Sequence, residues 1–375
     1  MPEQAKTNSS YNILILINVR WWNASAFYAL NTARVLKKYG NRVWVGTKKE
    51  SPPGKKCIEW NLPHVELNFE GYNILKLIKN FYRLLKFVKE NNIHIINTHR
   101  PEDNTFGALL KLIHPSVKFV ITRGDRRKIR KNLFSKLIYQ KIADRIIITC
   151  KAIYHQNLDV LEKVKSKVSV IYGSVNEDLF VIKKKRKEIL KELKIKPGKI
   201  IVGMAGRFDY VKDQYTFLKI ASEVSKEIKN VHFILAGKEE HIKINEMKQI
   251  AKTYNIYDKL TIINYTSNIQ DIMNTFDICL ILSTFSETIS RVVMEYLFLG
   301  KPVIGTDINV IKELIKDKYN GYIIKPGDFK KGARKVIKLC KDRHLRKLMG
   351  KRSRMLYKKN YNEKTFYTHV MRVFK

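Results

Sequence analysis

The chain has 375 residues, 45% of them hydrophobic, and a formal net charge of +39. This length exceeds what one hydrophobic core usually organises, so it predicts two domains. No apolar run approaches the roughly 20 residues that cross a bilayer, and the cysteines at positions 57, 150, 279 and 340 lack metal-ligand spacing, which argues against a membrane-spanning protein, a disulfide scaffold and a zinc module.

The positive charge predicts attraction to a polyanion, because it far exceeds what solubility requires. Aromatic residues do not interleave with the basic ones as in RNA-binding modules, and no helix-turn-helix spacing occurs, so an anionic membrane surface is favoured over nucleic acid. A solvated, lysine-rich surface would also account for the charge. The polar residues 1–10 and the short apolar run 13–17 do not form a signal peptide, which predicts a cytoplasmic location at the inner face of the plasma membrane.

In the first half, short β-branched runs alternate with segments of helical periodicity, which is typical of a parallel sheet covered on both faces. The small residues 23–26 are expected to start a helix, and another helix is predicted over 73–90. The predicted strands are residues 12–17, 42–46, 93–97, 118–122, 145–150 and 168–172.

The basic run 183–187 marks the boundary between the halves, since adjacent cations would repel one another if buried. It predicts an exposed linker leading into a helix. The strands predicted after it are residues 199–204, 231–236, 259–263, 277–282, 301–305 and 321–325. Two doubly wound α/β domains joined in this way bind ligands at the carboxyl ends of their strands, and this predicts an active site between the domains.

A histidine and a basic segment stand out in the first half. His99 follows the strand 93–97 and precedes a polar loop, a position suited to ligand contact, although a lone histidine is more often structural. Residues 123–131 are rich in arginine and lysine and precede apolar residues at helical spacing, Leu133, Leu137, Ile138 and Ile142. This pattern predicts a basic amphipathic helix for anionic lipid headgroups or a phosphorylated glycolipid, and a charged helix face over the core explains it equally well.

Chemistry concentrates in the second half. The strand 199–204 runs into Gly206 and Arg207, and Lys212 follows. A glycine turn lets the backbone approach a ligand while two cations project from the strand end, which suits a pyrophosphate. A purely structural turn is the alternative for this motif alone.

Two carboxylates, Glu287 and Glu295, follow the strand 277–282 with seven residues between them. Glu295 falls within an apolar helix, where a polar partner such as a ribose hydroxyl pair would offset the cost of burying it. Glu287 falls at the strand-to-helix turn, where free backbone N–H groups can bind phosphate and the carboxylate can accept sugar hydroxyls. Each carboxylate alone would be read as an ordinary helix charge.

Arg207 and Lys212, followed by Glu287 and Glu295, resemble the signature of retaining GT-B glycosyltransferases, in particular glycosyltransferase family 4, the group 1 glycosyltransferases. Residues 170–180 and 320–328 are also similar to segments of that family, so the resemblance covers most of the chain. It implies an α/β GT-B fold of two Rossmann-like domains facing a cleft. The implied parts are an acceptor domain over residues 1–180, a nucleotide-sugar domain over residues 181–355, and a terminal helix over residues 356–375 that returns to the first domain.

The resemblance also implies roles for single residues. Arg207 and Lys212 would hold the donor diphosphate, Glu295 the ribose, and Glu287 the transferred sugar, while His99 matches an active-site histidine. It implies no metal and no cofactor, with a nucleotide diphosphate sugar, most simply a UDP-sugar, as the donor substrate. Where many relatives have glycine after the position of Glu287, this chain has bulkier residues, and Ser290 is expected to take that place.

The acceptor side departs further from the family pattern. Its first loop usually carries glycines, whereas this chain has Arg20 and Trp21, which are expected to form an acceptor wall or a membrane-facing tip. The resemblance also places Arg123, Asp125 and Arg126 on the acceptor domain.

The predicted function is therefore retaining, metal-independent transfer of a hexose to a cell-envelope glycan or glycolipid such as a lipopolysaccharide core. Two alternatives stay open at this point. One is a nucleotide-sugar epimerase of the same architecture, and the other is a non-catalytic protein that binds polyanions.

Overall fold

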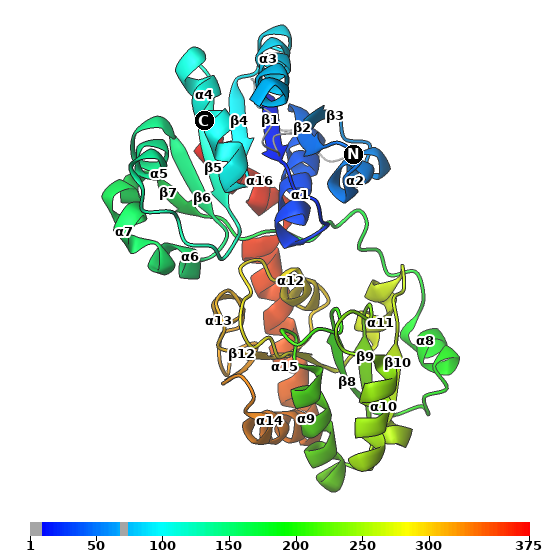
Figure 1. Cartoon of the computed structure of the whole chain (residues 1–375). Coiled ribbons are helices and arrows are strands. Elements are labelled where there is room, and N and C mark those ends of the chain that lie inside the picture. The colour runs from blue at the N-terminus through cyan, green and yellow to red at the C-terminus, as the bar shows by residue number, and fades with distance from the viewer. Residues whose placement is uncertain (1–9, 68–73) are drawn as a thin grey trace. The chain divides into compact units, whose positions relative to one another are not determined.

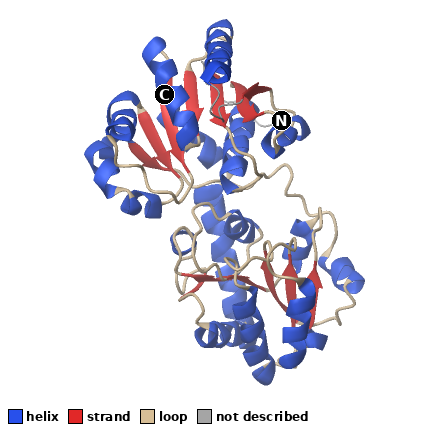
Figure 2. Ribbon diagram, in the orientation of Figure 1, coloured by secondary structure: helices blue, strands red, loops and turns tan. Residues whose placement is uncertain are grey.

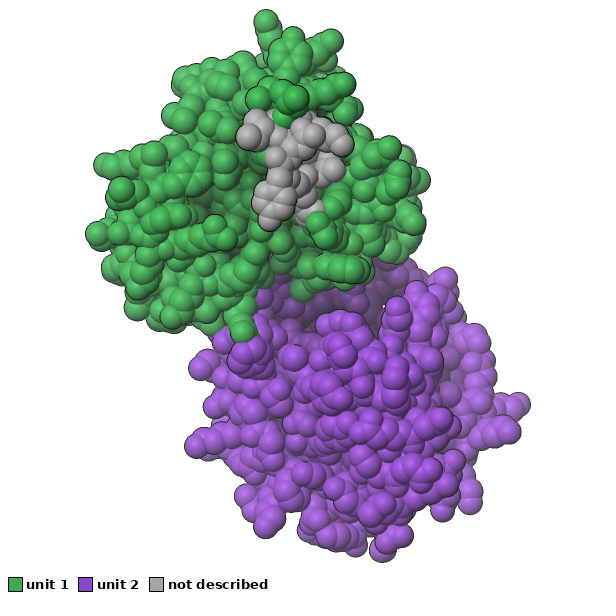
Figure 3. Space-filling view, in the orientation of Figure 1, with its two compact units in different colours: residues 1–173, 363–375 green, residues 174–362 purple. Residues whose placement is uncertain are grey.

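The computed structural model describes residues 10–67 and 74–375 (Figure 1). The chain forms two compact units, which Figure 3 distinguishes by colour. Unit 1 comprises residues 1–173 and 363–375, and unit 2 comprises residues 174–362. The predicted domain boundaries after residues 180 and 355 lie close to these limits, and their standing as boundaries of independently folding domains stays a prediction.

Unit 1 contains a seven-stranded sheet in which all neighbouring strands are parallel, in the order β3-β2-β1-β4-β5-β6-β7. The strands consist mainly of buried β-branched residues, as expected for a sheet covered on both faces (Figure 2). They are β1 (Asn12–Ile17), β2 (Arg42–Lys48), β3 (His64–Leu67), β4 (Ile95–Thr98), β5 (Lys118–Arg123), β6 (Arg145–Ile148) and β7 (Val168–Val170).

The helices of unit 1 connect these strands. Asn23 caps the amino end of the first helix, as the sequence predicted. Its side-chain oxygen accepts a hydrogen bond from the backbone N of Ala26 at 2.9 Å. The helices are α1 (Ala24–Lys38), α2 (Pro52–Glu59), α3 (Ile74–Glu90), α4 (Pro101–Ile113), α5 (Leu133–Leu137), the π-helical turn η1 (Ile138–Ile142), α6 (Lys151–Gln156), α7 (Leu158–Leu161) and the C-terminal α16 (Glu363–Phe374). Asn73, the predicted first residue of the third helix, lies outside the described residues.

Unit 2 is built on a six-stranded parallel sheet in the order β10-β9-β8-β11-β12-β13. Its strands are β8 (Ile200–Ala205), β9 (Val231–Ala236), β10 (Leu260–Ile263), β11 (Ile278–Ile281), β12 (Val303–Thr306) and β13 (Gly321–Ile324). Its principal helices are α8 (Arg186–Glu192), α9 (Gln214–Glu227), α10 (Ile244–Thr253), α11 (Ile269–Thr275), α12 (Arg291–Phe298), α14 (Phe329–Lys341) and α15 (Arg343–Leu356). Phe208, Phe217 and Phe233 are fully buried in its core.

The predicted α/β fold is confirmed, and the structure corrects three details. The edge strand β3 was not predicted. The basic run 183–187 is exposed apart from Arg186, which is half-buried and forms an ion pair with Asp277 at 2.7 Å. The apolar positions after residue 131 form only the short α5 and η1, and Leu133 stays 85% exposed instead of packing on the core. Within the described ranges, no helix combines the length and apolar character needed to cross a membrane.

The C-terminal helix α16 belongs to unit 1 and is held there by a buried ion pair. Glu363, only 4% exposed, pairs with Arg34 and with Lys38 of α1, the latter at 2.9 Å. The ring of Phe366 in α16 packs edge-on against the ring of Tyr28 in α1. Residues separated by more than 300 positions in the sequence therefore complete one core.

We expect Glu363→Gln to lower the free energy of unfolding by about 3 kcal/mol, because it leaves the Arg34 guanidinium half-buried without its carboxylate. A shift of the urea denaturation midpoint measures the effect. Glu59→Gln, which removes an exposed ion pair with Lys56, is the matched control and should cost less than about 0.5 kcal/mol. Equal shifts for the two variants would contradict this account of α16.

Candidate active site

The predicted donor-site residues of unit 2 lie at the centre of its sheet. Strands β8 and β11 are neighbours, although β9 and β10 intervene in the sequence, so the strand order reverses between them. Loops leaving two such strands diverge to opposite faces and open a space at their carboxyl ends, where ligands bind in doubly wound sheets. Arg207 and Lys212 follow β8, whereas Glu287, Ser290 and Glu295 follow β11.

Two glycines allow close packing of the loops after β8 and β9. Gly206 has φ +151°, and its amide donates a hydrogen bond to the Ala236 carbonyl at 2.9 Å. A Cβ atom on Gly237 would lie 1.8 Å from the Gly206 carbonyl oxygen. Any side chain at Gly237 would therefore push the loop that carries Arg207 away from its observed position.

Arg207 lies on the exposed side of this loop and already has acidic partners. Its guanidinium forms an ion pair with Glu240 and lies 3.8 Å from the Asp209 carboxylate. The side chain is 58% exposed, and a guanidinium offers five N–H donors. It can therefore bind a phosphate oxygen while it keeps a carboxylate neighbour.

Asp209 and Gln214 fix the shape of the loop between Arg207 and Lys212. The Gln214 amide donates to the Arg207 carbonyl at 2.8 Å and accepts from the Asp209 backbone N at 3.2 Å. Burial alone would raise the pKa of Asp209, but hydrogen bonds from the Val211 amide and His241, with the Arg207 charge, outweigh it and hold that pKa below its usual value. Asp209 is thus ionised and organises the loop.

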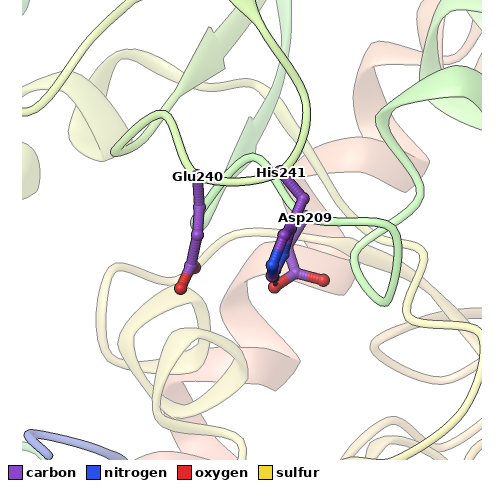
Figure 4. A group of neighbouring side chains, drawn as sticks. All are labelled: Asp209, Glu240 and His241. Atoms are coloured by element: carbon purple, nitrogen blue, oxygen red, sulfur yellow. Dashed lines mark hydrogen bonds and ion pairs between the residues drawn. The ribbon is translucent and has the colours of Figure 1, made fainter.

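Asp209, Glu240 and His241 form a cluster whose ligand-type atoms all lie within 4.8 Å of one another. Figure 4 shows the three side chains pointing the same way from the loops after β8 and β9. A cation could bind such a group, but Arg207 pairs with both carboxylates and supplies positive charge there. The Nδ1 atom of His241 lies 3.3 Å from a carboxylate oxygen of Asp209. We interpret the cluster as a clamp that positions Arg207, and the predicted absence of a metal stays a prediction.

Lys212 and Glu287 meet directly across the reversal point. The Lys212 ammonium forms an ion pair with Glu287, and the Ser283 hydroxyl donates to the same carboxylate at 3.0 Å. Only 9% of the Glu287 side chain and 20% of the Lys212 side chain are exposed. The structure therefore brings together Lys212, which is predicted to bind the diphosphate, and Glu287, which is predicted to bind the transferred sugar.

The remaining predicted donor-site residues lie near the start of α12. The buried Ser290 hydroxyl has no hydrogen-bond partner among the described residues, and Ser290 precedes α12, whose first N–H groups have no acceptor within the helix itself. Burial raises the pKa of Glu295, against the opposing charge of Arg291, whose Nε lies 3.1 Å from the carboxylate. Both side chains are suited to a polar ligand that satisfies them.

In unit 1 the reversal of strand order lies between β1 and β4, and His99 directly follows β4. The ring Nε2 donates to the Asn97 side-chain oxygen at 2.9 Å, while the Asn97 amide donates to the Val120 carbonyl and the Thr122 hydroxyl. Burial lowers the pKa of His99 to about 3. The imidazole is therefore neutral at physiological pH, with Nδ1 available as an acceptor.

The predicted acceptor-side residues differ in how accessible they are. Arg20 and Arg126 are exposed, and Trp21 is 73% exposed in the loop after β1. Arg123 is buried and donates to the Tyr139 hydroxyl at 3.1 Å and to Asp125 at 3.2 Å. Its guanidinium thus holds the loop after β5 in place, whereas Arg20, Trp21 and Arg126 are accessible from solvent.

Sequence reasoning missed several polar residues around these sites. Asp209 lies in the same short loop as Arg207, so its spacing was a usable signal, whereas Glu240 and His241 are recognisable only once β9 is placed beside β8. In unit 1 the buried Asn18 side chain has no hydrogen-bond partner in the described part of the chain, and its backbone N donates to Asp103 at 3.2 Å. Its position after β1 adds a polar group at the edge that carries His99.

Comparison with known proteins relates these features to a family. Residues 185–355 match the family model described as glycosyl transferases group 1. The chain is 27% identical over 223 residues to N-acetyl-alpha-D-glucosaminyl L-malate synthase from Bacillus anthracis, an alignment that spans 56% of each protein. It is 21% identical to UDP-Gal:alpha-D-GlcNAc-diphosphoundecaprenol alpha-1,3-galactosyltransferase from Escherichia coli, over 75% of each protein.

Solved structures share the whole fold. A glycosyltransferase from Rickettsia africae superposes with a TM-score of 0.85 at 19% identity and covers 98% of each chain. The Anabaena protein HepE, solved in complex with UDP, superposes with a TM-score of 0.83 at 16% identity, covering 96% of this chain and 98% of its own. The fold is therefore that of the GT-B glycosyltransferases. More particularly, unit 2 carries the domain of the group 1 glycosyltransferases.

We expect the neutral state of His99 to make folding stability depend on pH. The folded pKa of about 3 lies below the ordinary value of 6.5, so between these values the unfolded chain binds a proton that the folded chain does not. The free energy of unfolding should therefore fall by about 1.4 kcal/mol per pH unit as the pH drops below 6.5.

Replacing His99 with glutamine should remove that contribution, which urea denaturation at neutral pH and near pH 5 would show. The control His155→Gln, at an exposed histidine, should keep the wild-type pH dependence. If His99→Gln keeps it as well, the buried neutral imidazole is not its source.

Proposed function

We propose that this protein transfers a hexose from a UDP-sugar to a glycan or glycolipid acceptor of the cell envelope, such as a lipopolysaccharide core, with retention at the anomeric carbon. The observation that carries the donor part is the arrangement in unit 2. Two cations after β8 and two carboxylates after β11 gather where the strand order reverses. An ion pair between Lys212 and Glu287 links the two groups.

The chemistry of these residues suits a leaving nucleoside diphosphate. Arg207 and Lys212, with the free N–H groups at the start of α12, would neutralise the negative charge that grows on the diphosphate as the glycosidic bond breaks. On this proposal no metal or cofactor is required. Glu295 would accept hydrogen bonds from the ribose hydroxyls, and these bonds would offset the cost of burying its carboxylate. Ser290 would donate a hydrogen bond to a phosphate oxygen.

Retention would follow from attack on the same face of the sugar from which the diphosphate leaves. We nominate no protein nucleophile, and the leaving phosphate oxygen would help to remove the proton from the acceptor hydroxyl. Glu287 would hold hydroxyls of the transferred sugar. The neutral imidazole of His99 would orient the sugar by accepting a hydrogen bond at Nδ1 and would not act as a general acid.

The nature of the acceptor and the location of the protein rest on separate support. The name of the Escherichia coli relative contains UDP-Gal and a diphosphoundecaprenol-linked sugar, and HepE was solved with UDP. Both favour a UDP-sugar as donor, and the first favours a lipid-borne glycan as acceptor. The four cysteines are all buried, and none of them forms a disulfide, as expected for a reducing compartment. We therefore place the protein in the cytoplasm, at the inner face of the plasma membrane.

The first test is thermal stabilisation by a panel of nucleoside diphosphates and nucleotide sugars, because a ligand that binds only the folded state raises the melting temperature. We expect a selective shift with UDP or UDP-sugars. Arg207→Ala should abolish the shift, whereas the control Arg334→Ala, at an exposed arginine of α14, should keep it. No shift with any nucleotide would favour the polyanion-binding alternative.

The Lys212–Glu287 ion pair allows a sharper test of the separate roles. Glu287→Gln frees the ammonium from its carboxylate, so UDP affinity should stay unchanged or rise severalfold, while sugar transfer falls by about 100-fold or more. Isothermal titration with UDP and a transfer assay with lipid-borne acceptor measure the two effects. A variant that transfers sugar at the wild-type rate would remove Glu287 from the site. Turnover of the donor without any acceptor would favour the epimerase alternative.

A further inference from the structure

Large apolar side chains gather on the surface of three helices of unit 1. Nine of the 21 exposed large hydrophobic residues among those described lie on α3, α4 and α5. We call this surface the α3–α5 face. Its exposed apolar residues are Leu75, Ile78 and Tyr82 of α3, Leu109, Leu112 and Ile113 of α4, and Leu133, Phe134 and Leu137 of α5.

The three helices are neighbours on one side of the sheet. They connect β3 to β4, β4 to β5 and β5 to β6, which are steps in one direction along the strand order, so right-handed crossovers place them on the same face (Figure 1). The rings of Phe81 in α3 and Phe106 in α4 lie 6.1 Å apart. Asn104 of α4 donates to the Tyr139 hydroxyl of η1, which continues α5, at 3.1 Å.

The exposed residues of α3 follow a helical stripe that is separate from its core stripe. Leu84 and Val88 are buried against the sheet, whereas Leu75, Ile78 and Tyr82 are 78%, 60% and 67% exposed. Exposed cations alternate with this apolar stripe, Lys79, Arg83, Lys86 and Lys89. An apolar stripe edged by long basic side chains is the pattern of a helix that lies in a membrane interface.

The charge of the α3–α5 face selects among occupants. Residues 74–142 contain 16 lysines and arginines against four acidic residues. A second copy of the chain would bring two strongly positive surfaces together, which is unfavourable. Most of the nine apolar side chains are leucine or isoleucine, which cannot stack on bases as nucleic-acid binding requires. An anionic lipid bilayer satisfies both the charge and the apolar surface.

We propose that the α3–α5 face docks unit 1 on an anionic lipid bilayer, with its nine apolar side chains below the headgroups and the flanking lysines and arginines bound to lipid phosphates. The helices run opposite to the strands of the sheet, so Leu75 and Leu133 lie at the edge where the strands end. That edge also carries the exposed Trp21 and Arg126. The inference rests on the proposed function only in supposing that a lipid-borne acceptor reaches this edge.

Sedimentation of the full chain with vesicles tests the proposal. The vesicles contain equal parts of phosphatidylethanolamine and phosphatidylglycerol, and vesicles of phosphatidylcholine are the neutral comparison. We expect binding to the anionic vesicles that weakens as salt is raised. The variant Leu75→Gln, Ile78→Gln, Tyr82→Gln, which keeps the charge, should weaken it at least about tenfold.

Matched controls separate this face from general exposure and charge. Ile58→Gln, Leu179→Gln, Tyr265→Gln removes three apolar side chains of similar exposure elsewhere and should change binding less than about twofold. On α3, Lys79→Gln, Arg83→Gln, Lys86→Gln should weaken binding. The same three-charge change on α14, at Lys330, Arg334 and Lys338, all exposed, should have a much smaller effect.

The outcomes are distinct from those for the proposed function. All variants should keep the melting shift with UDP. Absence of binding to anionic vesicles, equal losses in the control variants, or α3 variants that bind as the wild type does would each overturn the docking proposal. A change of oligomeric state in the α3 variants without vesicle binding would instead make the face a contact between copies. Vesicle binding that depends on the α3–α5 face, without any nucleotide shift, would refute the transferase and leave the docking proposal standing.

Discussion

The reversal of strand order in each parallel sheet is the constraint on which the candidate site depends. Near the middle of each sheet, between β1 and β4 and between β8 and β11, adjacent strands send their connections to opposite faces. The loops that leave these two points diverge, and His99, Arg207 and Glu287 lie on them.

Opposite charge inside unit 2 keeps the donor residues in place before any ligand arrives. Arg207 is paired with Glu240, and Lys212 with Glu287. Each cation is thus neutralised by a carboxylate in the absence of ligand. On the proposed function, a diphosphate would compete with these carboxylates, and its affinity would reflect the difference between the two interactions. The carboxylate released in this way would then be available to the sugar.

The sequence predicted twelve of the thirteen strands found in residues 10–67 and 74–375 because a buried parallel strand is a β-branched run with clear ends. It missed β3 because His64 and Glu66 interrupt a four-residue edge strand that pairs with β2 alone. Helical spacing placed Leu133 and Leu137 on one apolar stripe but did not show whether that stripe meets the core or the surface, and both side chains are exposed. Glu240 was missed because its partner Arg207 is a neighbour only across the β8–β9 pair.

The position of α16 has a consequence for how the chain folds during synthesis. The surface of α1 that contacts Phe366 and Glu363 is made early, but its partners are translated more than 300 residues later. Unit 2, whose residues 174–362 are contiguous, can become compact while unit 1 still lacks a helix. Tyr28 and Arg34 must then wait until α16 has left the ribosome, so unit 1, which begins earlier in the sequence, is completed after unit 2, and chaperones would have the longest access to it.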